Sequence, residues 1–440
     1  MKCLIGLDIG TRNCKAYAID INGKIIAKVS RAYDLIFPSP GMVEQDPEDW
    51  WRASFECIKE IINRTKAEVL AIGLSSQANT LLLLDKEGKA LMNAISWLDQ
   101  RSTKEVIDLN MKFGEDEIHN ITGMIPNPGF VASKILWFKK KREQLLRKTR
   151  IILFSPQSYI AYKLTGKFVV DRSLASFSML YNIRRENWFN ELLEFTGINE
   201  KLLPEILNSH EVVGEIKNEI KKKLGLKRDV MLIIGAHDQC CAALGAGLLD
   251  KSTIVDSTGT ASAIIGFLDE LPNKIPRNLL CYHYVIPRKW TILGTLSASG
   301  ALIDWFLRLL GKRDIYRKME EKARNVKAGS NDVIVLPYFS GSFRSEIPQQ
   351  IKGAILGLTL SHEAHHIYRA IMEAISFEIK YFLEIIEEIS HPINRVISVG
   401  GGSKSRLWRE IKANVFGKPI LRPLIAVSYT HLTLPTTERV

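Results

Sequence analysis

The segment LIGLDIGTRNCKAYAIDINGKIIA, residues 4–27, decides the fold. An apolar strand pattern ends at Asp8, a tight Gly-Thr turn follows, and a second apolar stretch leads to Asn22 and Gly23. An Asn-Gly pair between two apolar stretches is a strong hairpin signal, because a type I′ turn needs positive φ at both central positions. The segment therefore predicts three consecutive antiparallel strands with a carboxylate beside the first turn.

The same pattern returns in the second half of the chain, as STIVDSTGTASAIIGFL at residues 252–268. Amphipathic helical stretches and apolar strands follow both copies. Two halves built alike predict a duplicated α/β fold, in which two domains flank a cleft. We place the N-terminal domain at residues 1–246 and the C-terminal domain at residues 247–423.

Composition excludes several classes of protein. No apolar stretch reaches the roughly 18 residues that a membrane-spanning helix needs, and no signal peptide precedes the first strand pattern. The six cysteines form no CxxC pair, as expected for free thiols in the cytoplasm. The net charge is +12, but the densest basic run, residues 139–150, lacks the interleaved aromatic residues of a single-strand binder. We expect a solvated helix there and no nucleic-acid partner.

The two hairpin turns are candidate phosphate sites. Small residues at a hairpin bend expose several backbone N–H groups in one direction, and such a nest binds phosphate oxygens. Thr11 and Thr260 add hydroxyl donors, and Lys15 supplies a positive charge. Asp8 would repel a phosphate chain unless a cation lay between them, which favours Mg²⁺. Two ordinary hairpins with aspartate as a turn residue are the alternative.

A general base is predicted at Asp238, which follows the buried strand pattern VMLIIGAH and precedes a helix. A hydroxyl that attacks a γ-phosphate needs a positioned carboxylate to accept its proton. A helix N-cap is the alternative role for this residue. The Gly-rich run at residues 400–402 joins a strand to a helix, but it is neither GxGxxG nor a Walker loop.

Polar residues suited to a hydroxyl-rich ligand follow two further strands. Gln77 and Asn79 lie in SSQANT, and Trp97, Asp99 and Arg101 lie in WLDQR. An aromatic wall with a carboxylate and a guanidinium would hold a polyol by bidentate hydrogen bonds. A surface ion pair is the alternative interpretation of Asp99 and Arg101.

These elements together resemble the FGGY family of carbohydrate kinases, closest to its xylulokinase-like branch. The resemblance runs from residue 3 to about residue 423 and is most specific in GAILGLTLSHEAHHIYRAIMEAISFE, residues 353–378. It implies the fold of the actin, hexokinase and heat-shock ATPase superfamily, with two ribonuclease-H-like domains of mixed sheets and helices. It also implies an ATP-dependent transfer of the γ-phosphoryl group to a hydroxyl of a ketose or a polyol.

The resemblance assigns roles by position. Asp8 assists Mg²⁺, and Asp238 is the general base that also faces the sugar, together with Gln77, Asn79 and Asp99. The remaining positions lie at the phosphates and the adenosine of ATP: Thr11, Lys15, Gly259, Thr260, Gly401, Gly402 and Ser403.

Three departures from the family pattern shape our expectations. Xylulokinases usually carry Met-His where Ala78 and Asn79 stand, so we expect a substrate other than D-xylulose, with glycerol, erythritol or another polyol as alternatives. The family prefers a small residue where Val131 stands. Residues 424–440, LIAVSYTHLTLPTTERV, depart from the family ending, and we expect a non-native tail on a truncated C-terminal domain. A sugar-sensing regulator without catalysis is the alternative of another class, and a homodimer is left open.

Overall fold

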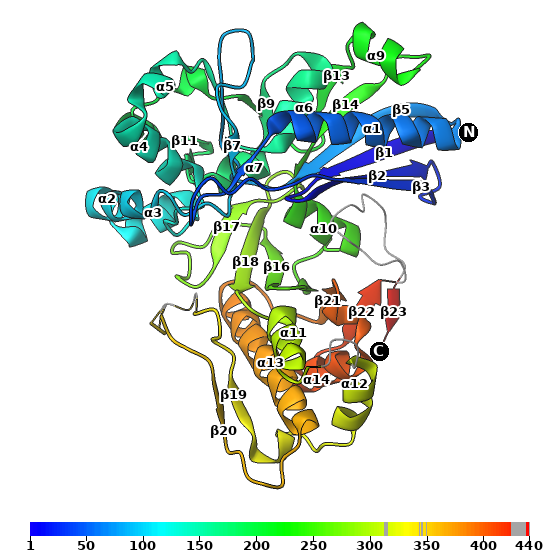
Figure 1. Cartoon of the computed structure of the whole chain (residues 1–440), viewed down its shortest axis with the longest axis vertical. Coiled ribbons are helices and arrows are strands. Elements are labelled where there is room, and N and C mark those ends of the chain that lie inside the picture. The colour runs from blue at the N-terminus through cyan, green and yellow to red at the C-terminus, as the bar shows by residue number, and fades with distance from the viewer. Residues whose placement is uncertain (312–315, 343, 345, 349, 424–436, 440) are drawn as a thin grey trace. The chain divides into compact units, whose positions relative to one another are not determined.

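The computed structural model describes residues 1–311, 316–342, 344, 346–348, 350–423 and 437–439 (Figure 1). The chain divides into two compact units. The N-terminal unit comprises Met1–Gly245 together with Cys281–Trp290. The C-terminal unit comprises Ala246–Leu280 and the described residues from Thr291 onward.

A six-stranded mixed sheet forms the centre of the N-terminal unit, in the order β13-β14-β5-β1-β2-β3. Strand β1 pairs antiparallel with β2 and parallel with β5, and β14 extends the parallel part beyond β5. Strand β13 closes this edge in the antiparallel direction. The strands are β1 (Lys2–Ile9), β2 (Asn13–Asp20), β3 (Ile25–Ala32), β5 (Glu68–Ser76), β13 (Val212–Glu215) and β14 (Met231–His237).

The predicted β2–β3 hairpin is confirmed, but its turn is not type I′. Gly23 has a φ of +83°, whereas Asn22 is not among the residues with positive φ. The carboxylate of Asp20 accepts hydrogen bonds from the backbone N–H groups of Asn22 and Lys24, both at 2.9 Å. This side-chain bonding holds the turn in a longer form that needs a left-handed residue only at Gly23.

Helix α1 (Pro47–Thr65) packs along β2 and β3. Its buried residues Trp50, Cys57, Ile58 and Ile61 join one hydrophobic core with the sheet. Asp46 caps the helix by accepting from the N–H of Glu48. The other helices of this unit are α2 (Thr103–Phe113), α3 (Glu115–Thr122), α4 (Val131–Lys141), α5 (Glu143–Lys148), α6 (Pro156–Thr165), α7 (Arg172–Phe177), α8 (Asn190–Thr196), α9 (Asn218–Leu224) and α10 (Asp238–Ala246, whose last residue enters the C-terminal unit).

Short strands connect these helices. They are β4 (Glu44–Gln45), β6 (Leu82–Leu84), β7 (Ala94–Ile95), β8 (Ile151–Leu153), β9 (Val169–Asp171), β10 (Tyr181–Asn182), β11 (Asn187–Trp188) and β12 (Glu205–Leu207).

The sheet of the C-terminal unit has the order β17-β18-β16-β15-β21-β22-β23. Strand β15 pairs antiparallel with β16 and parallel with β21, β22 extends the parallel part, and β23 is antiparallel to β22. The strands β16-β15-β21-β22-β23 have the same order and the same relative directions as β2-β1-β5-β14-β13 in the N-terminal unit. This repeat confirms the predicted duplicated α/β fold. The strands are β15 (Thr253–Thr258), β16 (Ser262–Leu268), β17 (Leu280–His283), β18 (Trp290–Leu296), β21 (Arg395–Val399), β22 (Ile420–Pro423) and β23 (Thr437–Arg439).

The helices of the C-terminal unit pack around the long helix α13 (Figure 1). They are α11 (Gly300–Leu309), α12 (Tyr316–Arg324), α13 (Ala364–Ile389) and α14 (Arg406–Phe416), and a small sheet joins β19 (Ile334–Leu336) to β20 (Ala354–Leu356). Within the described residues, no helix is long and apolar enough to cross a membrane. The predicted non-native tail lies outside the described residues except for β23.

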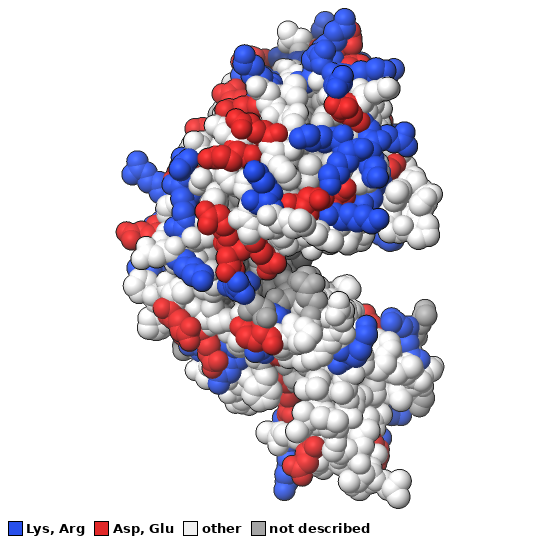
Figure 2. Space-filling view, turned by 90° about the vertical axis from the view of Figure 1, so that its left-hand side faces the viewer, with Lys and Arg blue, Asp and Glu red and all other residues white. Residues whose placement is uncertain are grey.

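Lys and Arg side chains are mixed with Asp and Glu on the face of the molecule in Figure 2. The positive net charge is therefore not gathered into a single patch on that face.

Candidate active site

Asp8 lies near the end of β1 and is 3% exposed. Its neighbour across the parallel pair is Ser75 on β5, whose hydroxyl donates to Asp8 Oδ1 at 3.2 Å. Burial, together with the negative charge of Asp238, raises the pKa of Asp8 to about 8, against the opposing charge of Lys15. Two carboxylates therefore act on each other here, and a cation beside Asp8 would relieve their repulsion.

The turn after β1 is joined to residues far along the chain. Gly10 N–H donates to Asn13 O at 3.0 Å, and Tyr33 Oη donates to Gly10 O at 2.5 Å. Thr11 O accepts from Gln45 Nε2 at 2.8 Å, and Thr11 Oγ1 accepts from the indole N–H of Trp97 at 3.1 Å. Thr11 is thus in contact with one of the residues predicted to face a polyol.

Gln77 and Asn79 follow β5 and are both buried. Gln77 Nε2 donates to Gln45 Oε1 at 2.7 Å, and Asn79 Nδ2 donates to Phe177 O at 3.1 Å. Asn79 has a φ of +53°, a left-handed conformation that asparagine tolerates better than most residues. Gln77 Oε1 and Asn79 Oδ1 have no hydrogen-bond partner in the described part of the chain, so two buried acceptors remain for a ligand.

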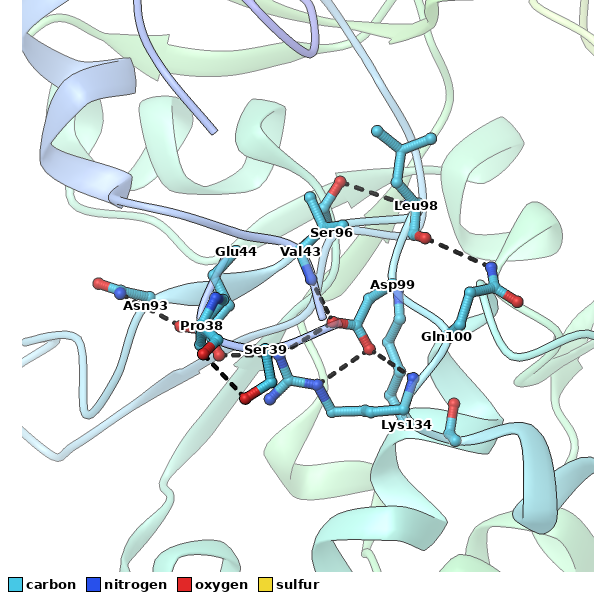
Figure 3. A network of polar contacts seen from close by, with 12 residues as sticks. Pro38, Ser39, Val43, Glu44, Asn93, Ser96, Leu98, Asp99, Gln100 and Lys134 are labelled. Atoms are coloured by element: carbon cyan, nitrogen blue, oxygen red, sulfur yellow. Dashed lines mark hydrogen bonds and ion pairs between the residues drawn. The ribbon is translucent and has the colours of Figure 1, made fainter. Parts of the chain in front are cut away.

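Asp99 is fully buried in the network of Figure 3. Its Oδ2 accepts from Val43 N–H at 2.6 Å and from Arg101 Nη2 at 2.9 Å. Its Oδ1 accepts from the N–H and the Nε of Arg101, both at 2.9 Å. Arg101 also donates to Glu44 at 2.8 Å. The ion pair that the sequence left open exists, but it lies in the interior, and donors of the chain itself surround the Asp99 carboxylate.

Asp238 is the first residue of α10, directly after β14. Its Oδ1 lies 3.1 Å from His237 Nε2, and its side chain is 21% exposed. The His237 ring stacks on Phe177 with centroids 4.7 Å apart, and the His237 N–H donates to Ser173 Oγ at 2.9 Å. These contacts fix the end of β14, and they leave the Asp238 carboxylate accessible.

Lys134 on α4 was not predicted as a functional residue. It is fully buried, and its Nζ donates to Asn79 O at 2.6 Å and to Gly129 O at 2.7 Å. Burial lowers its pKa to about 7. The lysine holds the carbonyl of the left-handed Asn79, so it fixes the loop that carries the unpartnered amide oxygen. A lysine within the apolar stretch FVASKILWF is the signal that could have revealed it.

A second network lies beneath the hairpin of the C-terminal unit. Asp256 is fully buried on β15, and it accepts from Ser398 Oγ at 3.1 Å and from Thr258 Oγ1 at 2.7 Å. The ammonium group of Lys412, also buried, pairs with Asp256 and donates to Thr258 Oγ1 at 2.7 Å. Lys412 comes from α14, 156 residues further along the chain. Sequence reasoning missed it because nothing local distinguishes this lysine from a solvated one.

Backbone contacts tie the bend of that hairpin to the start of α11. Gly300 N–H donates to Gly259 O at 2.9 Å, and the N–H groups of Ser299 and Ala301 donate to Thr260 O at 3.0 and 3.1 Å. The two predicted phosphate positions, Gly259 and Thr260, are therefore anchored through their carbonyls.

The three glycines at 400–402 differ in what surrounds them. A Cβ at Gly400, where φ is +83°, would lie 2.5 Å from Thr258 O, and a Cβ at Gly402 would lie 2.4 Å from Thr258 Cγ2. Apart from its chain neighbours, no atom of the described residues lies within 4 Å of a Cβ at Gly401. Two of the glycines thus allow the loop to pack on the hairpin, and Gly401 borders open space. Ser403 Oγ closes the loop by donating to Gly400 O at 2.8 Å.

Comparison with known proteins identifies the family. The sequence pattern of the FGGY family of carbohydrate kinases matches residues 3–245 with its N-terminal domain and residues 255–429 with its C-terminal domain. The chain belongs to the FGGY family of carbohydrate kinases. It is therefore a phosphotransferase that moves a phosphoryl group from ATP to a hydroxyl of a sugar or a polyol.

Relatives of this kinase act on different substrates. It is 30% identical to the xylulose kinase of Bacillus subtilis, over 96% of this chain and 85% of the relative. It is also 30% identical to the glycerol kinase of Thermococcus gammatolerans, over 96% of this chain and 86% of the relative. The structure of ligand-bound xylulose kinase from Lactobacillus acidophilus superimposes with a TM-score of 0.91 at 29% identity, covering 98% of this chain and 87% of the other.

The glycine loop yields a prediction about stability. Gly402→Ala should destabilise the kinase by about 1–3 kcal/mol, because the new methyl group overlaps Thr258. Gly401→Ala should leave stability unchanged or raise it by up to about 1 kcal/mol, since its φ of −64° suits alanine and the space is open. Urea unfolding of both variants measures the difference, and equal losses would contradict the assigned packing.

Lys134 yields a prediction about pH. Below about pH 7 the lysine is charged in both the folded and the unfolded chain, so the full cost of burying the charge is present. As the pH rises from 7 toward the unfolded pKa of ~10.4, the unfolded chain binds more protons than the folded chain, and stability rises. Wild-type kinase should therefore gain about 2–3 kcal/mol relative to Lys134→Met between pH 6 and pH 9.

The control is Lys140→Met on the same helix, where the lysine is exposed and pairs with Asp108. Its free energy of unfolding relative to wild type should stay constant over that pH range. If Lys134→Met and Lys140→Met gave the same pH dependence in urea unfolding, Lys134 would not be a buried group with a lowered pKa.

Proposed function

We propose that this kinase transfers the γ-phosphoryl group of ATP to a hydroxyl of a ketose or a polyol, with Asp238 as the general base. The observation that carries the proposal is the accessibility of the Asp238 carboxylate, compared with that of two fully buried aspartates. Asp99 and Asp256 are surrounded by donors of the chain, whereas the Asp238 side chain is 21% exposed and its only ion-pair neighbour within the described residues is His237. An accessible carboxylate at the end of a strand can accept the proton of an attacking hydroxyl.

The acceptor binds beside Gln77 and Asn79 in this proposal. Their unpartnered amide oxygens each need a donor, and a sugar hydroxyl supplies one. Asp99 supports this region by holding Val43 and Arg101 in place, and Trp97 offers an apolar wall that is 45% exposed. A ligand with several hydroxyl groups can donate to both amide oxygens at once. Because these acceptors are held in place before it binds, little entropy is lost in ordering them, which favours such a ligand over water.

The phosphates and the adenosine are assigned to the two hairpins and the glycine loop. Thr11 and Lys15 contact phosphate oxygens in the N-terminal unit, and Gly259 and Thr260 do so in the C-terminal unit. The adenosine lies against Gly401, Gly402 and Ser403, and the open space at Gly401 supports this assignment.

Mg²⁺ fits the residues around Asp8. The ion binds proteins through one or two carboxylates while substrate phosphates and water complete its shell. Asp8 is a buried carboxylate with no ion pair in the described chain, and its pKa is raised partly by Asp238, as expected where a cation is the missing partner. When bound, Mg²⁺ would neutralise charge on the phosphates. The six cysteines are all buried and free, which supports a cytoplasmic location.

Removal of the base tests the mechanism. Asp238→Asn keeps the shape of the side chain but cannot accept a proton, so kcat should fall on the order of 100-fold to 10,000-fold while ATP affinity survives. Asp108→Asn on the surface of α2 is the control and should retain full activity. If Asp238→Asn kept more than about a third of kcat, another group would be the base.

The substrate is tested with a panel of D-xylulose, D-ribulose, gluconate, erythritol and glycerol. Because Ala78 and Asn79 replace a larger pair, we expect a compound other than D-xylulose to give the highest kcat/KM. A coupled assay of ADP release measures each acceptor. A tenfold advantage for D-xylulose would overturn this expectation.

A further inference from the structure

A cavity of about 210 Å³ lies within the N-terminal unit, apart from the residues assigned to the sugar. The start of α7, the turn between β10 and β11, the loop after β12 and the turn between β17 and β18 enclose it. The residues that matter for the argument are Arg172, Glu186, Asn208, Ser209, His283 and Arg288. Because one water occupies roughly 30 Å³ in the liquid, the space exceeds that of a single ion and suits a small metabolite.

The lining contains two guanidinium groups and one carboxylate. Arg172 is held rigidly, because it donates to Tyr181 Oη at 2.8 Å, to Glu186 at 3.2 Å and to Asn208 Oδ1 at 3.3 Å. Arg288 is exposed and has no hydrogen-bond or ion-pair partner in the described part of the chain. The net positive charge of the lining favours an anion, and the free guanidinium offers paired donors for phosphate oxygens.

A buried imidazole in the lining also lacks a partner. His283 is 2% exposed, and its Nε2 is among the buried atoms without a hydrogen bond in the described residues. Burial, together with the charge of Arg172, lowers its pKa to about 3, so the ring is neutral and can donate one hydrogen bond to a ligand. Buried polar atoms are rarely left unpaired, and a polar ligand is one way to satisfy this nitrogen.

Hydrogen bonds join the cavity to the end of β14. Ser209 Oγ donates to the buried carboxylate of Asp171 at 3.0 Å, and Ser173 Oγ donates to the same oxygen at 2.6 Å. Ser173 Oγ in turn accepts from the N–H of His237, the residue before Asp238. The cavity wall and the position of the proposed base therefore share one rigid network.

We propose that this cavity binds a small phosphorylated metabolite, with the phosphate held by Arg172 and Arg288 beside His283. The site is separate from the site of phosphoryl transfer, since neither Asp8, Gln77 nor Asn79 lines it. The volume beyond the phosphate accommodates a sugar-sized body.

Equilibrium dialysis with labelled inorganic phosphate tests the site at constant ionic strength. A saturating non-hydrolysable ATP analogue with Mg²⁺ occupies the nucleotide site, so that phosphate bound there does not contribute. Wild-type kinase should retain one bound phosphate per chain. Fructose 6-phosphate should displace it, and fructose should not.

Variants of Arg288 decide whether the binding occurs in this cavity. Arg288→Gln should weaken phosphate binding at least tenfold and Arg288→Glu should abolish it. Melting temperatures should stay unchanged, because Arg288 makes no hydrogen bond or ion pair with the residues that the structure describes. Arg185→Gln, an exposed arginine outside the lining, is the matched control and should bind as wild type. Absence of retained phosphate in wild type, wild-type binding by Arg288→Gln, or equal displacement by fructose would each overturn the proposal.

Discussion

Both units depend on an aspartate near the end of the central strand that accepts a hydrogen bond from a serine directly opposite on the parallel neighbour. Asp8 pairs in register with Ser75, and Asp256 pairs in register with Ser398. Each serine hydroxyl donates to its aspartate, at 3.2 and 3.1 Å. Because a buried carboxylate is costly without hydrogen bonds, this contact fixes the register of the strand pair from which each hairpin projects.

The two copies differ in how the negative charge is compensated. Lys412 neutralises Asp256 inside the C-terminal unit, so that carboxylate is committed to structure and holds Thr258 beneath the hairpin bend. Asp8 has no ion pair in the described residues, and its pKa is raised to about 8. In the duplicated framework one aspartate is thus a structural anchor, while the other is the carboxylate that we propose for Mg²⁺. This asymmetry follows from a single residue on α14.

The sequence predicts the parts of this arrangement that depend on local patterns. Alternating apolar strands, the Asn-Gly pair and the repeated acidic Gly-Thr turn are local signals, and they indicate the hairpins and the duplication. The predicted type I′ turn at Asn22 was wrong, because the side chain of Asp20 accepts hydrogen bonds from the backbone of the turn and favours another turn type. The apolar stretch around Lys134 could have indicated a buried lysine, but its partner Asn79 lies 55 residues away and could not be predicted. The role of Lys412 could not be predicted at all, since Asp256 lies 156 residues away and no local feature marks this lysine as buried.

The buried charges of this kinase are better explained by positioning than by stability. A buried ion pair such as Lys412 with Asp256 loses much of its Coulomb energy to desolvation, and an apolar replacement is often as stable. Lys134 has carbonyl groups rather than a carboxylate as hydrogen-bond partners, so its charge is a net cost. In each case the ammonium group holds a short segment that local preferences would not fix: the left-handed Asn79 in one unit and the hydroxyl of Thr258 in the other. The buried charges therefore lower stability at places where the backbone must hold one geometry before a ligand binds. A ligand can then bind without reorganisation of the backbone.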